Sequence, residues 1–446
     1  MAKQTAREAA LDLLVKIEKN EAYSNLLMNK AIEANHFDPK DTALFTRLVY
    51  GTVQRRNTLD FYLDTFLKKS PEQWVRVLLR LAVYQMAYLD RVPDRAVLHE
   101  SVEIAKRRGH KGIAGLVNGV LRSIQRQGLP NPSDTENSLD QLAVETSHPA
   151  WLLEQWLSEY DRETVLNICE ANNTLPSVTV RTNTVKITRD QLLEKLEDEG
   201  IEAVPGTLAP EAIRVEKGAV QHTKCFQDGL FTIQDESSML AAHALDVQEG
   251  MNVLDGCAAP GGKTTHIAQL MDNTGSVTAL DLHKHKVKLI EQQANRLGLT
   301  NVTAEALDSR KAEERFPEEA FDRILVDAPC SGFGVIRRKP DIKWGKTSAD
   351  IERLTMVQTD ILEALAKLLK PGGKLVYSTC TIEKKENEGI VAAFLKRHPH
   401  FSLDQTLSNC LPESAASHIK EEGQLQILPQ DFGTDGFYIA KLQRKA

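Results

Sequence analysis

The sequence predicts three regions of different fold class: an all-α bundle, a small α+β module and an α/β domain with a Rossmann-like sheet. Apolar residues recur at three- and four-residue spacing through roughly the first 130 residues, which is typical of amphipathic helices. β-branched runs first appear near residue 175, in "SVTVRTNTV". From residue 236 onward short apolar strands alternate with helical segments, which indicates βαβ units and a mostly parallel sheet.

Bulk composition restricts the class of protein. The chain has 446 residues, more than one ordinary core holds, and its 41% hydrophobic and 26% charged content is typical of a soluble globular protein. The start, "MAKQTAREAALDLLVKI", reads as an amphipathic helix rather than a signal peptide, and no apolar run is long enough to span a membrane. The six cysteines have no C-x-x-C spacing, which argues against a metal site or disulfide framework and predicts a cytoplasmic protein.

The domain boundaries follow from changes in pattern. We expect an all-α domain at 1–130, a linker with connecting helices at 131–174, a small α+β module at 175–235 and the α/β domain at 236–446. The stretch "QGLPNPSDTENS", 127–138, is rich in Pro, Asn and Ser, as linkers commonly are.

Individual elements are predicted from periodicity. In the first domain, 43–67 and 72–89 are helical throughout. The small module has strands in "SVTVRTNTV", "AIRVE" and "GLFTIQD", with a helix in "TRDQLLEKLEDEG". The α/β domain has strands in "MNVLD", "SVTALD", "VTAEAL", "FDRILVDAP" and "GKLVYST", a helix in "TDILEALAKLLKPG" and a terminal hairpin in "LQILPQDFGTDGFYIAKL".

A glycine-rich turn, "LDGCAAPGGKTTH" at 254–266, joins the first strand of the α/β domain to the next helix. Such a turn lets a ligand approach the backbone at a helix N-terminus. A phosphate-binding P-loop needs G-x-x-x-x-G-K-[ST], but Cys257 stands where the first glycine is required. A nucleotide-hydrolysing enzyme is therefore the weaker of two interpretations.

The stronger interpretation is a site for S-adenosylmethionine. It requires an acidic residue at the end of the second strand, where a carboxylate accepts hydrogen bonds from ribose hydroxyls, and Asp281 stands there. Asp308 follows the third strand, near the expected adenine, and Asp327 ends the fourth. Three aspartates in register after a glycine-rich loop favour a methyltransferase sheet.

Two cysteines follow neighbouring strands, Cys330 in "VDAPCSGFG" and Cys380 in "LVYSTCT". The C5 atom of cytosine is a poor nucleophile, but addition of a thiolate to C6 makes C5 reactive; this is covalent catalysis. Asp327 would hydrogen-bond the N3/N4 edge of the base. Chemistry alone leaves open which cysteine attacks, since a site must first lower the pKa of a thiol.

These motifs resemble those of a known family. "DGCAAPGGKTTH", "DAPCSGFGVIRRKPDIKW" and "YSTCT" are similar to the motifs of the RNA 5-methylcytosine methyltransferases of the NOL1/Nop2/Sun family, and the similarity covers the last two hundred or so residues. "VRTNT" and "TIQDESSML" resemble the small RNA-binding module of that family. The N-terminal helices, with "LAVYQMAYLDRVPDRAVLHESVEIAKRRGHKGIAGLVNGVLRSI", resemble a NusB-like RNA-binding domain, a combination typical of bacterial enzymes acting on 16S rRNA.

The resemblance implies roles for individual residues. Cys380 is expected to be the nucleophile and Cys330 to assist release of the methylated product. Lys263 and Asp327 are expected to reach towards the base. The implied cofactor pocket, for S-adenosylmethionine and with no metal, consists of Cys257, Ala258, Ala259, Pro260, Gly261, Gly262, Lys263, Asp281, Asp308 and Asp327.

Two basic stretches are candidate RNA contacts, although a charge run usually just faces water. The expected contacts are Arg337, Arg338 and Lys339 after Cys330, and Arg107 and Arg108 in the first domain. The net charge of −7 does not exclude RNA binding, because local patches matter more than the total.

Trp344 is equally compatible with stacking on a base and with a place in a core. A base must leave its stack to be methylated, so a single-stranded or loop cytosine is expected. We expect a monomer acting on 16S rRNA, free or within a partly assembled small subunit. A non-catalytic RNA-binding or assembly factor remains an alternative in which neither cysteine matters. The sequence does not identify the cytosine.

Overall fold

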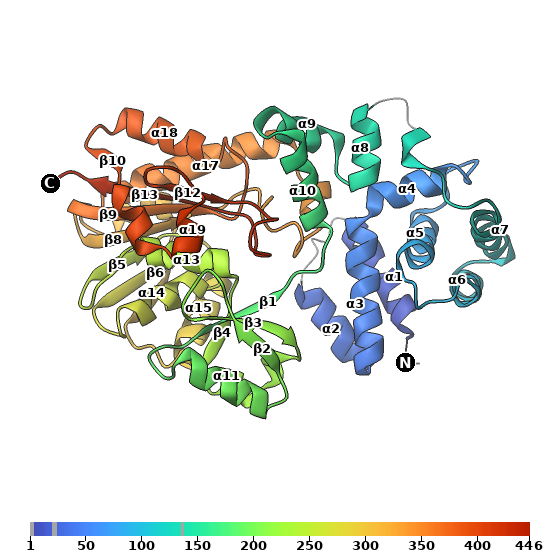
Figure 1. Ribbon diagram of the computed structural model, residues 1–446, viewed down its shortest axis with the longest axis horizontal. Helices are drawn as coiled ribbons and strands as arrows, with labels where there is room; N and C mark the ends of the chain where they lie inside the picture. Colours follow the sequence, from blue (N-terminus) through green and yellow to red (C-terminus); the bar gives the residue numbers. More distant parts are fainter. Residues whose placement is uncertain (1–3, 20–24, 135–137) are drawn as a thin grey trace. The chain divides into compact units, whose positions relative to one another are not determined.

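The chain folds into two compact units. The computed structural model describes residues 4–19, 25–134 and 138–446, coloured along the chain in Figure 1. The first unit comprises residues 1–174 and 336–345, and the second comprises 175–335 and 346–446. The segment after Cys330 therefore leaves the second unit, packs as part of the first and returns. None of the helices in the described residues has the length and apolar character that crossing a bilayer requires.

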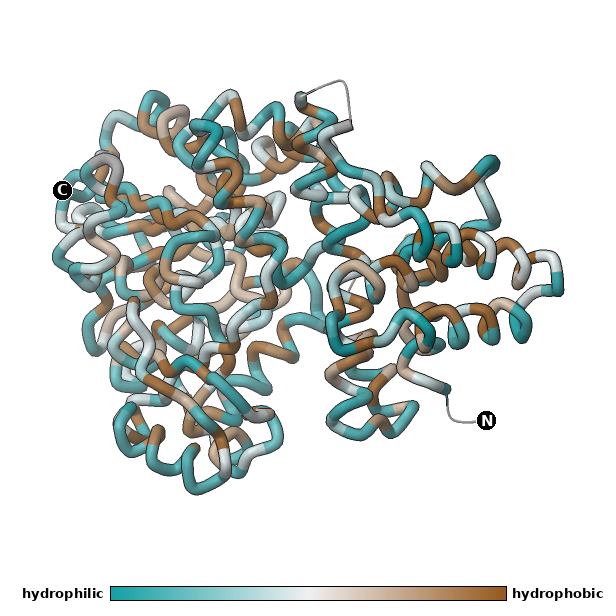
Figure 2. Tube along the Cα trace, turned by 45° about the vertical axis from the view of Figure 1, so that its right-hand side comes forward, coloured by the Kyte–Doolittle hydropathy of each residue, from teal (hydrophilic) through white to brown (hydrophobic). Residues whose placement is uncertain are grey.

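The first unit is all helical, as predicted. Its apolar stripes meet in one core that includes Phe45, Leu48, Leu79, Val83 and Leu121, and hydrophobic and hydrophilic residues alternate along its helices in Figure 2. The helices are α1 (Ala6–Glu18), α2 (Asn25–Asn35), α3 (Pro39–Gln54), α4 (Arg56–Asp64), α5 (Gln73–Tyr88), α6 (Asp94–Arg108), α7 (Lys111–Gln127), α8 (Ser138–Thr146), α9 (Ala150–Glu159), α10 (Arg162–Asn172) and α16 (Ile342–Gly345).

Two details of the first unit refine the sequence prediction. The helical stretch 43–67 consists of two helices, because the backbone leaves helical geometry at Arg55 between α3 and α4. The expected connecting helices of 131–174 are α8 to α10, which follow a short 3₁₀ turn at Pro132–Asp134. Part of the predicted linker, residues 135–137, lies outside the described residues.

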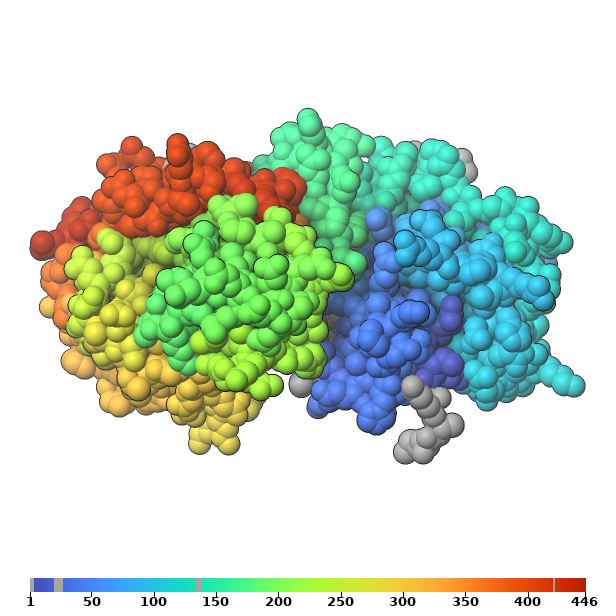
Figure 3. Space-filling model, turned by 60° about the horizontal axis from the view of Figure 1, so that its bottom comes forward, coloured from blue at the N-terminus to red at the C-terminus, as the bar shows by residue number. Residues whose placement is uncertain are grey.

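The small module of the second unit is an antiparallel four-stranded sheet in the order β2-β3-β1-β4. Its core joins Val180, Ile213 and Phe231 to Leu192 and Leu196 of the covering helix. The elements are β1 (Val178–Thr182), α11 (Arg189–Asp198), β2 (Glu202–Pro205), β3 (Ala212–Lys217), α12 (Lys224–Gln227) and β4 (Phe231–Ile233). Strand β2 was not predicted, because it is a short, largely exposed edge strand ending in proline. Figure 3 shows this module, in green, adjoining the yellow segments of the same unit.

The rest of the second unit is built on a mixed sheet in the order β11-β12-β13-β9-β8-β5-β6-β7. Strands β9, β8, β5, β6 and β7 are parallel, which confirms the predicted α/β domain. The strands and their connecting helices are α13 (Glu236–Ala244), β5 (Asn252–Asp255), α14 (Gly262–Leu270), β6 (Ser276–Asp281), α15 (Lys284–Leu297), β7 (Val302–Ala306), β8 (Phe321–Asp327), α17 (Ser348–Ala366), β9 (Leu369–Thr379) and α18 (Glu388–Arg397).

Both faces of this sheet are buried, which explains why its central strands are apolar throughout. Val253, Leu325 and Val376 face the core under α13 and α14. The adjacent Leu254 and Ile324 face the opposite core, under α17 and α18. Figure 1 shows these two pairs of helices on opposite sides of the sheet. Because helices cover both faces, the carboxyl edge of the parallel strands is occupied by loops.

The end of the chain forms the predicted antiparallel hairpin, β12 (Gln424–Ile427) with β13 (Phe437–Arg444). Strand β13 also pairs antiparallel with β9, so the hairpin extends the parallel sheet. The remaining short elements are β10 (Phe401–Leu403), α19 (Glu413–Ala416) and β11 (Ile419–Glu421). Strand β9 starts at Leu369, earlier than predicted, and α17 starts at Ser348, eleven residues before the predicted helix.

Candidate active site

The predicted site residues of the α/β domain come from loops at one edge of the sheet. After β5 the chain passes to β6 on one side, whereas β8 lies on the other side of β5. Ligands of open α/β sheets bind at the carboxyl edge where the strand order reverses in this way. Asp255 and Asp327 end the two strands that flank this switch point, and Asp281 ends β6.

Asp327 is the centre of a polar cluster. Its Oδ2 atom lies 2.8 Å from Nζ of Lys263, and its Oδ1 accepts a hydrogen bond of 2.8 Å from the hydroxyl of Ser378. Burial opposes the charge of Lys263, but the carboxylate of Asp327 outweighs it and raises the pKa of the lysine. The ammonium also lies 4.9 Å from the ring centroid of Phe437, on β13. Lys263 is therefore a charged group fixed beside Asp327.

The two predicted cysteines face each other. The Sγ atoms of Cys330 and Cys380 are 3.4 Å apart, and both side chains are partly accessible. Contact with Cys380, together with burial, raises the pKa of the Cys330 thiol well above its ordinary value. The raised pKa disfavours a thiolate on Cys330. Cys380 also contributes to the raised pKa of Lys263, so a thiolate there has a nearby cation.

A buried network fixes the two loops that carry these cysteines. Glu386 accepts hydrogen bonds from the backbone N–H of Ser331, at 2.9 Å, and from the Ser331 hydroxyl. Nε2 of Gln358 donates to the same carboxylate at 2.8 Å and to the carbonyl oxygen of Pro329 at 2.9 Å. The backbone N–H of Gly334 donates to the carbonyl oxygen of Cys380 at 3.0 Å. Both thiols therefore sit on pre-organised backbone.

The glycine-rich loop runs from Cys257 to Lys263 and begins α14. The backbone N–H of Ala258 donates to the carbonyl oxygen of Leu280 on β6 at 2.8 Å, which attaches the loop to the sheet. Gly261 has φ +104°, a conformation that side chains disfavour, and it precedes the first residue of α14. The first N–H groups of this helix, which have no intrahelical partner, are directed at the loop.

The other predicted cofactor residues lie around this loop. Oδ1 of Asp281 accepts from the backbone N–H of His283 at 3.0 Å, and the next residue, Leu282, is 58% exposed. Asp308 caps a 3₁₀ turn, and its ion pair of 2.7 Å with Arg310 holds the pKa of its carboxyl below the ordinary value. Burial raises the pKa of the Cys257 thiol well above its ordinary value, so this cysteine is protonated.

The predicted RNA contacts are distributed differently. Arg337 is buried, Arg338 is half-buried and only Lys339 of these three is exposed. Trp344 packs against the core of the first unit, and its Nε1–H donates to the carbonyl oxygen of Val53 at 2.8 Å. The core interpretation of Trp344 is therefore the one that its position favours.

Arg107 and Arg108 are both exposed on α6, but each forms an ion pair with α1. Arg107 lies 2.8 Å from a carboxylate oxygen of Glu8, and Arg108 lies 2.6 Å from one of Asp12. The two acids partly neutralise this patch, which weakens its attraction for phosphate. Their role in RNA binding stays a prediction.

Sequence reasoning missed several members of the site. Ser378 could have been found, since it lies in the same motif as Cys380, next to the last residue of β9. Thr264 follows Lys263, and its hydroxyl donates to Asp255 at 2.7 Å. No sequence signal pointed to Phe437 or to Glu386, because their positions depend on the pairing of β13 with β9 and on the fold of the loop after β9.

Comparisons with known proteins agree with this architecture. Residues 242–443 match the family model "16S rRNA methyltransferase RsmB/F", residues 4–126 match "NusB family" and residues 148–221 match an RsmF/B-like ferredoxin-like domain. "Probable ribosomal RNA small subunit methyltransferase B" of Bacillus subtilis is 52% identical over 447 residues, with 100% of both chains covered. The chain belongs to the ribosomal RNA small subunit methyltransferase B family.

Other similar proteins support this assignment. "Ribosomal RNA small subunit methyltransferase B" of Salmonella newport is 36% identical, with 96% of each chain covered. The crystal structure of NSun6 from Pyrococcus horikoshii with SFG has a TM-score of 0.59 at 25% identity, covering 67% of this chain and 98% of that one. The family membership confirms the three-domain architecture and the S-adenosylmethionine-dependent methyltransferase class, and it does not favour the P-loop or non-catalytic alternatives.

Proposed function

We propose that this protein transfers the methyl group of S-adenosylmethionine to C5 of a cytosine in 16S rRNA through a covalent cysteine adduct. The observation that carries the proposal is the pair of thiols, Cys330 and Cys380, 3.4 Å apart at the sheet edge where Lys263 meets Asp327. The names of the full-length relatives support small-subunit rRNA as the substrate.

The residues around the glycine-rich loop fit S-adenosylmethionine. When bound, this cofactor supplies an electrophilic methyl group. Asp281 at the end of β6 offers carboxylate oxygens to ribose hydroxyls, and the exposed Leu282 beside it offers an apolar surface to the adenine. The N–H groups at the start of α14 suit the amino-acid carboxylate. SFG, the ligand of the similar NSun6 structure, is an analogue of S-adenosylmethionine, which supports S-adenosylmethionine as the cofactor.

Cys380 is the proposed nucleophile. The thiol of Cys330, with its raised pKa, keeps its proton and directs it to Cys380, and Lys263 adds a positive charge nearby. Both favour a thiolate on Cys380 rather than on Cys330. Addition of this thiolate to C6 of cytosine would make C5 nucleophilic, so that C5 could take the methyl group and release S-adenosylhomocysteine. Transfer of the C5 proton to a base would then expel the Cys380 thiolate from C6.

Asp327 and Cys330 act on the base and on the adduct. Oδ2 of Asp327 is held by Lys263 and Oδ1 by Ser378, so the carboxylate can accept a hydrogen bond from the N4 amino group of cytosine, and from N3 when N3 is protonated in the adduct, in a fixed orientation. Cys330 assists the release of product, since its sulfur is in contact with the sulfur that must leave C6. Lys339 is the most exposed of the expected RNA contacts in the loop, with Arg337 and Arg338 beside it.

The test combines methyl transfer with adduct trapping. Purified protein, S-adenosylmethionine and 16S rRNA, free or in small subunits, are incubated, and digested nucleosides are analysed for 5-methylcytidine. Cys380→Ala should give neither product nor adduct, whereas Cys330→Ala should accumulate an SDS-stable protein–RNA adduct. Cys169→Ala, a buried cysteine of the first unit, is the control and should behave like wild type.

Each contrary outcome is specific. An adduct that requires Cys330 and survives in Cys380→Ala would reverse the two roles. A methyl group on another atom or base would refute the cytosine-C5 assignment. Transfer of methyl groups without any adduct in either variant would refute covalent catalysis.

A further inference from the structure

The small module of the second unit contacts α14, the helix that follows the glycine-rich loop, through a buried arginine. Arg181 on β1 is fully buried, with 0% of its surface exposed. Its Nη1 donates to the carbonyl oxygen of Gly262 at 2.6 Å, and its Nη2 donates to the hydroxyl of Thr265 at 3.0 Å. Its Nε donates to Oε1 of Gln269, one turn further along α14, at 2.9 Å. Three contacts thus join one guanidinium to the first two turns of the helix.

These contacts act on the peptide groups that precede Lys263. The hydroxyl of Thr265 that accepts from Arg181 donates in turn to the carbonyl oxygen of Gly261 at 2.7 Å. Arg181 therefore fixes the carbonyl of Gly262 directly and that of Gly261 through Thr265. In a planar trans peptide group the C=O and N–H bonds point in opposite directions. Fixing the carbonyl groups of Gly261 and Gly262 therefore also fixes the direction of the N–H groups that follow them. Glycines do not fix this turn themselves, because they have the widest conformational freedom of all residues.

We propose that Arg181 is a positioning residue that orients the cofactor loop and, through it, Lys263. The small module would then have a second role besides RNA contact: it would form the rigid backing of the methyl-donor site. This inference rests on the proposed function for the identity of the donor.

The energetics of Arg181 support a role beyond joining two modules. Within the described residues no carboxylate oxygen lies in ion-pair contact with its guanidinium, which is surrounded by neutral acceptors. Burial lowers the pKa of Arg181 to about 9, a sign of the cost of holding this charge away from water. Apolar side chains would join the modules at lower cost, but they could not hold carbonyl groups at the start of α14.

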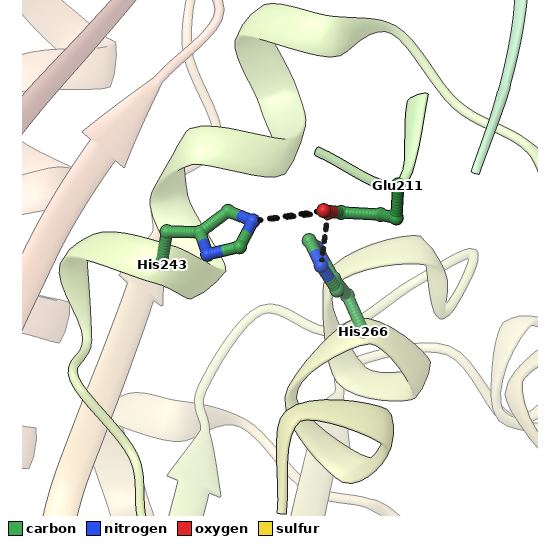
Figure 4. Close-up of side chains that lie close together, drawn as sticks. All are labelled: Glu211, His243 and His266. Carbon is green, nitrogen blue, oxygen red and sulfur yellow. Dashed lines mark hydrogen bonds and ion pairs between the residues drawn. The ribbon is translucent and has the colours of Figure 1, made fainter. Parts of the chain in front are cut away.

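A second contact of the small module reaches the same helix. Oε1 of Glu211, next to β3, lies 2.7 Å from Nε2 of His266 on α14 and 3.0 Å from Nε2 of His243 on α13 (Figure 4). A carboxylate and two imidazoles this close together could also bind a metal ion.

This cluster can be a clamp, in which Glu211 links the small module to α13 and α14, or a metal site. Two observations favour the clamp. The two contacts are shorter than the separation of about 3.3 Å between tetrahedral zinc ligands at bond lengths of about 2.0–2.1 Å. Burial and the neighbouring charge of Arg181 lower the pKa of His266 to about 3, and the same positive charge would repel a dication. Glu211 therefore accepts a hydrogen bond from His243 of α13 and lies against His266 of α14, and so it links both helices to the small module.

The experiment compares two arginines that join the same two modules: Arg181, which is fully buried, and Arg296, which is half-buried. Arg296 on α15 donates from Nη1 to the carbonyl oxygens of Phe226 and Phe231 at 2.8 and 2.9 Å, but it does not contact α14 in the described hydrogen-bond network. Arg181→Met and Arg296→Met remove comparable contacts, and Arg181→Lys restores a charge that can reach one carbonyl. Binding of S-adenosylmethionine to the full chain is measured by calorimetry without RNA, beside the Tm and the KM values for both substrates.

We expect Arg181→Met to weaken S-adenosylmethionine binding at least tenfold and to raise its KM accordingly, with the KM for RNA unchanged. Arg181→Lys should recover part of this loss. Arg296→Met should lower Tm by a similar amount and leave the affinity for S-adenosylmethionine within twofold of wild type. If Arg181→Met does not fold, Arg181→Lys and Thr265→Val provide the test. Each should bind S-adenosylmethionine about threefold more weakly than wild type.

Two outcomes would overturn the role of Arg181 but not the proposed function. The first is a folded Arg181 variant that binds S-adenosylmethionine as tightly as wild type does. The second is an equal loss of affinity for S-adenosylmethionine in Arg296→Met. A wild-type protein that does not bind S-adenosylmethionine would overturn the proposed function together with it. Metal analysis of the purified chain covers the remaining possibility. About one equivalent of zinc, lost in Glu211→Gln, would make the cluster a metal site and refute its assignment to the clamp.

Discussion

Two aspartates end neighbouring parallel strands, yet they have opposite environments. Asp255 on β5 is fully buried beneath the hydroxyl of Thr264, and burial raises its pKa to about 7. Asp327 on β8 keeps 27% of its side chain exposed and is paired with Lys263. Consecutive residues of α14 thus reach the two acids, one with a neutral hydroxyl and the other with a cation. The same sequence signal, an apolar strand ending in aspartate, produces a fully buried acid and a partly exposed, ion-paired one, to which we assign a structural and a catalytic role respectively.

The largest effect is expected from Asp327→Asn. The amide keeps the size of the side chain but loses the charge that pairs with Lys263 and the second acceptor for the base. We expect methyl transfer to fall by about 10²–10³-fold, as for other oriented groups that stabilise a reacting species. Single-turnover kinetics with saturating S-adenosylmethionine measures this loss.

The matched substitution is Asp255→Asn, whose rate should stay within a few-fold of wild type. Equal losses of rate in both variants would contradict the proposed separation of a structural acid, Asp255, from a catalytic one, Asp327. A normal rate in Asp327→Asn would remove the carboxylate from the mechanism.

The sequence predicted the acids themselves but not this difference between them. Asp281 and Asp327 stand at strand ends and Asp308 follows β7 by two residues, as predicted, because the carboxyl ends of parallel strands share one edge. Which acid is buried depends on what packs above it, here the first turn of α14, and this is a tertiary property. Asp255 was passed over because it lies inside the glycine-rich motif.

Other misses share this cause. Arg181 reads as one polar residue in a β-branched strand, and only the docking of the small module brings it to α14. The sequence left Trp344 open between a stacking and a core position, and the structure packs it with the first unit, since burial of an aromatic side chain is favourable. The RNA contacts of the basic residues in the same loop stay a prediction. Short edge strands such as β2 escaped because they bury little apolar surface.

A second prediction uses the raised pKa of Asp255. Its folded pKa of about 7 exceeds the ordinary value of 3.8, so the native state binds the proton more tightly than the unfolded state. The contribution of Asp255 to stability is therefore fully present below pH 4 and is lost as pH rises through 7. Asn cannot ionise, so Asp255→Asn should lack this loss.

Urea unfolding of wild type and Asp255→Asn between pH 5 and 8 measures the effect. The free energy of unfolding of the variant, relative to wild type, should increase by about 3 kcal/mol across this range. Taking the difference between the two proteins removes the titration of all shared groups. A difference that does not vary with pH would mean that Asp255 is ionised in the folded protein, and its contrast with Asp327 would then disappear.

The smallest effect is expected from Thr264→Val, which removes the hydroxyl above Asp255 and keeps the shape of the side chain. At pH 5, where Asp255 is protonated, we expect a loss of about 1 kcal/mol, the usual size of one neutral hydrogen bond. At pH 8, where the carboxylate has lost its only hydroxyl donor in the described network, the loss should be about 2–3 kcal/mol. Equal losses at the two pH values would show that the hydroxyl does not distinguish the two forms of Asp255, and burial alone would then account for its raised pKa.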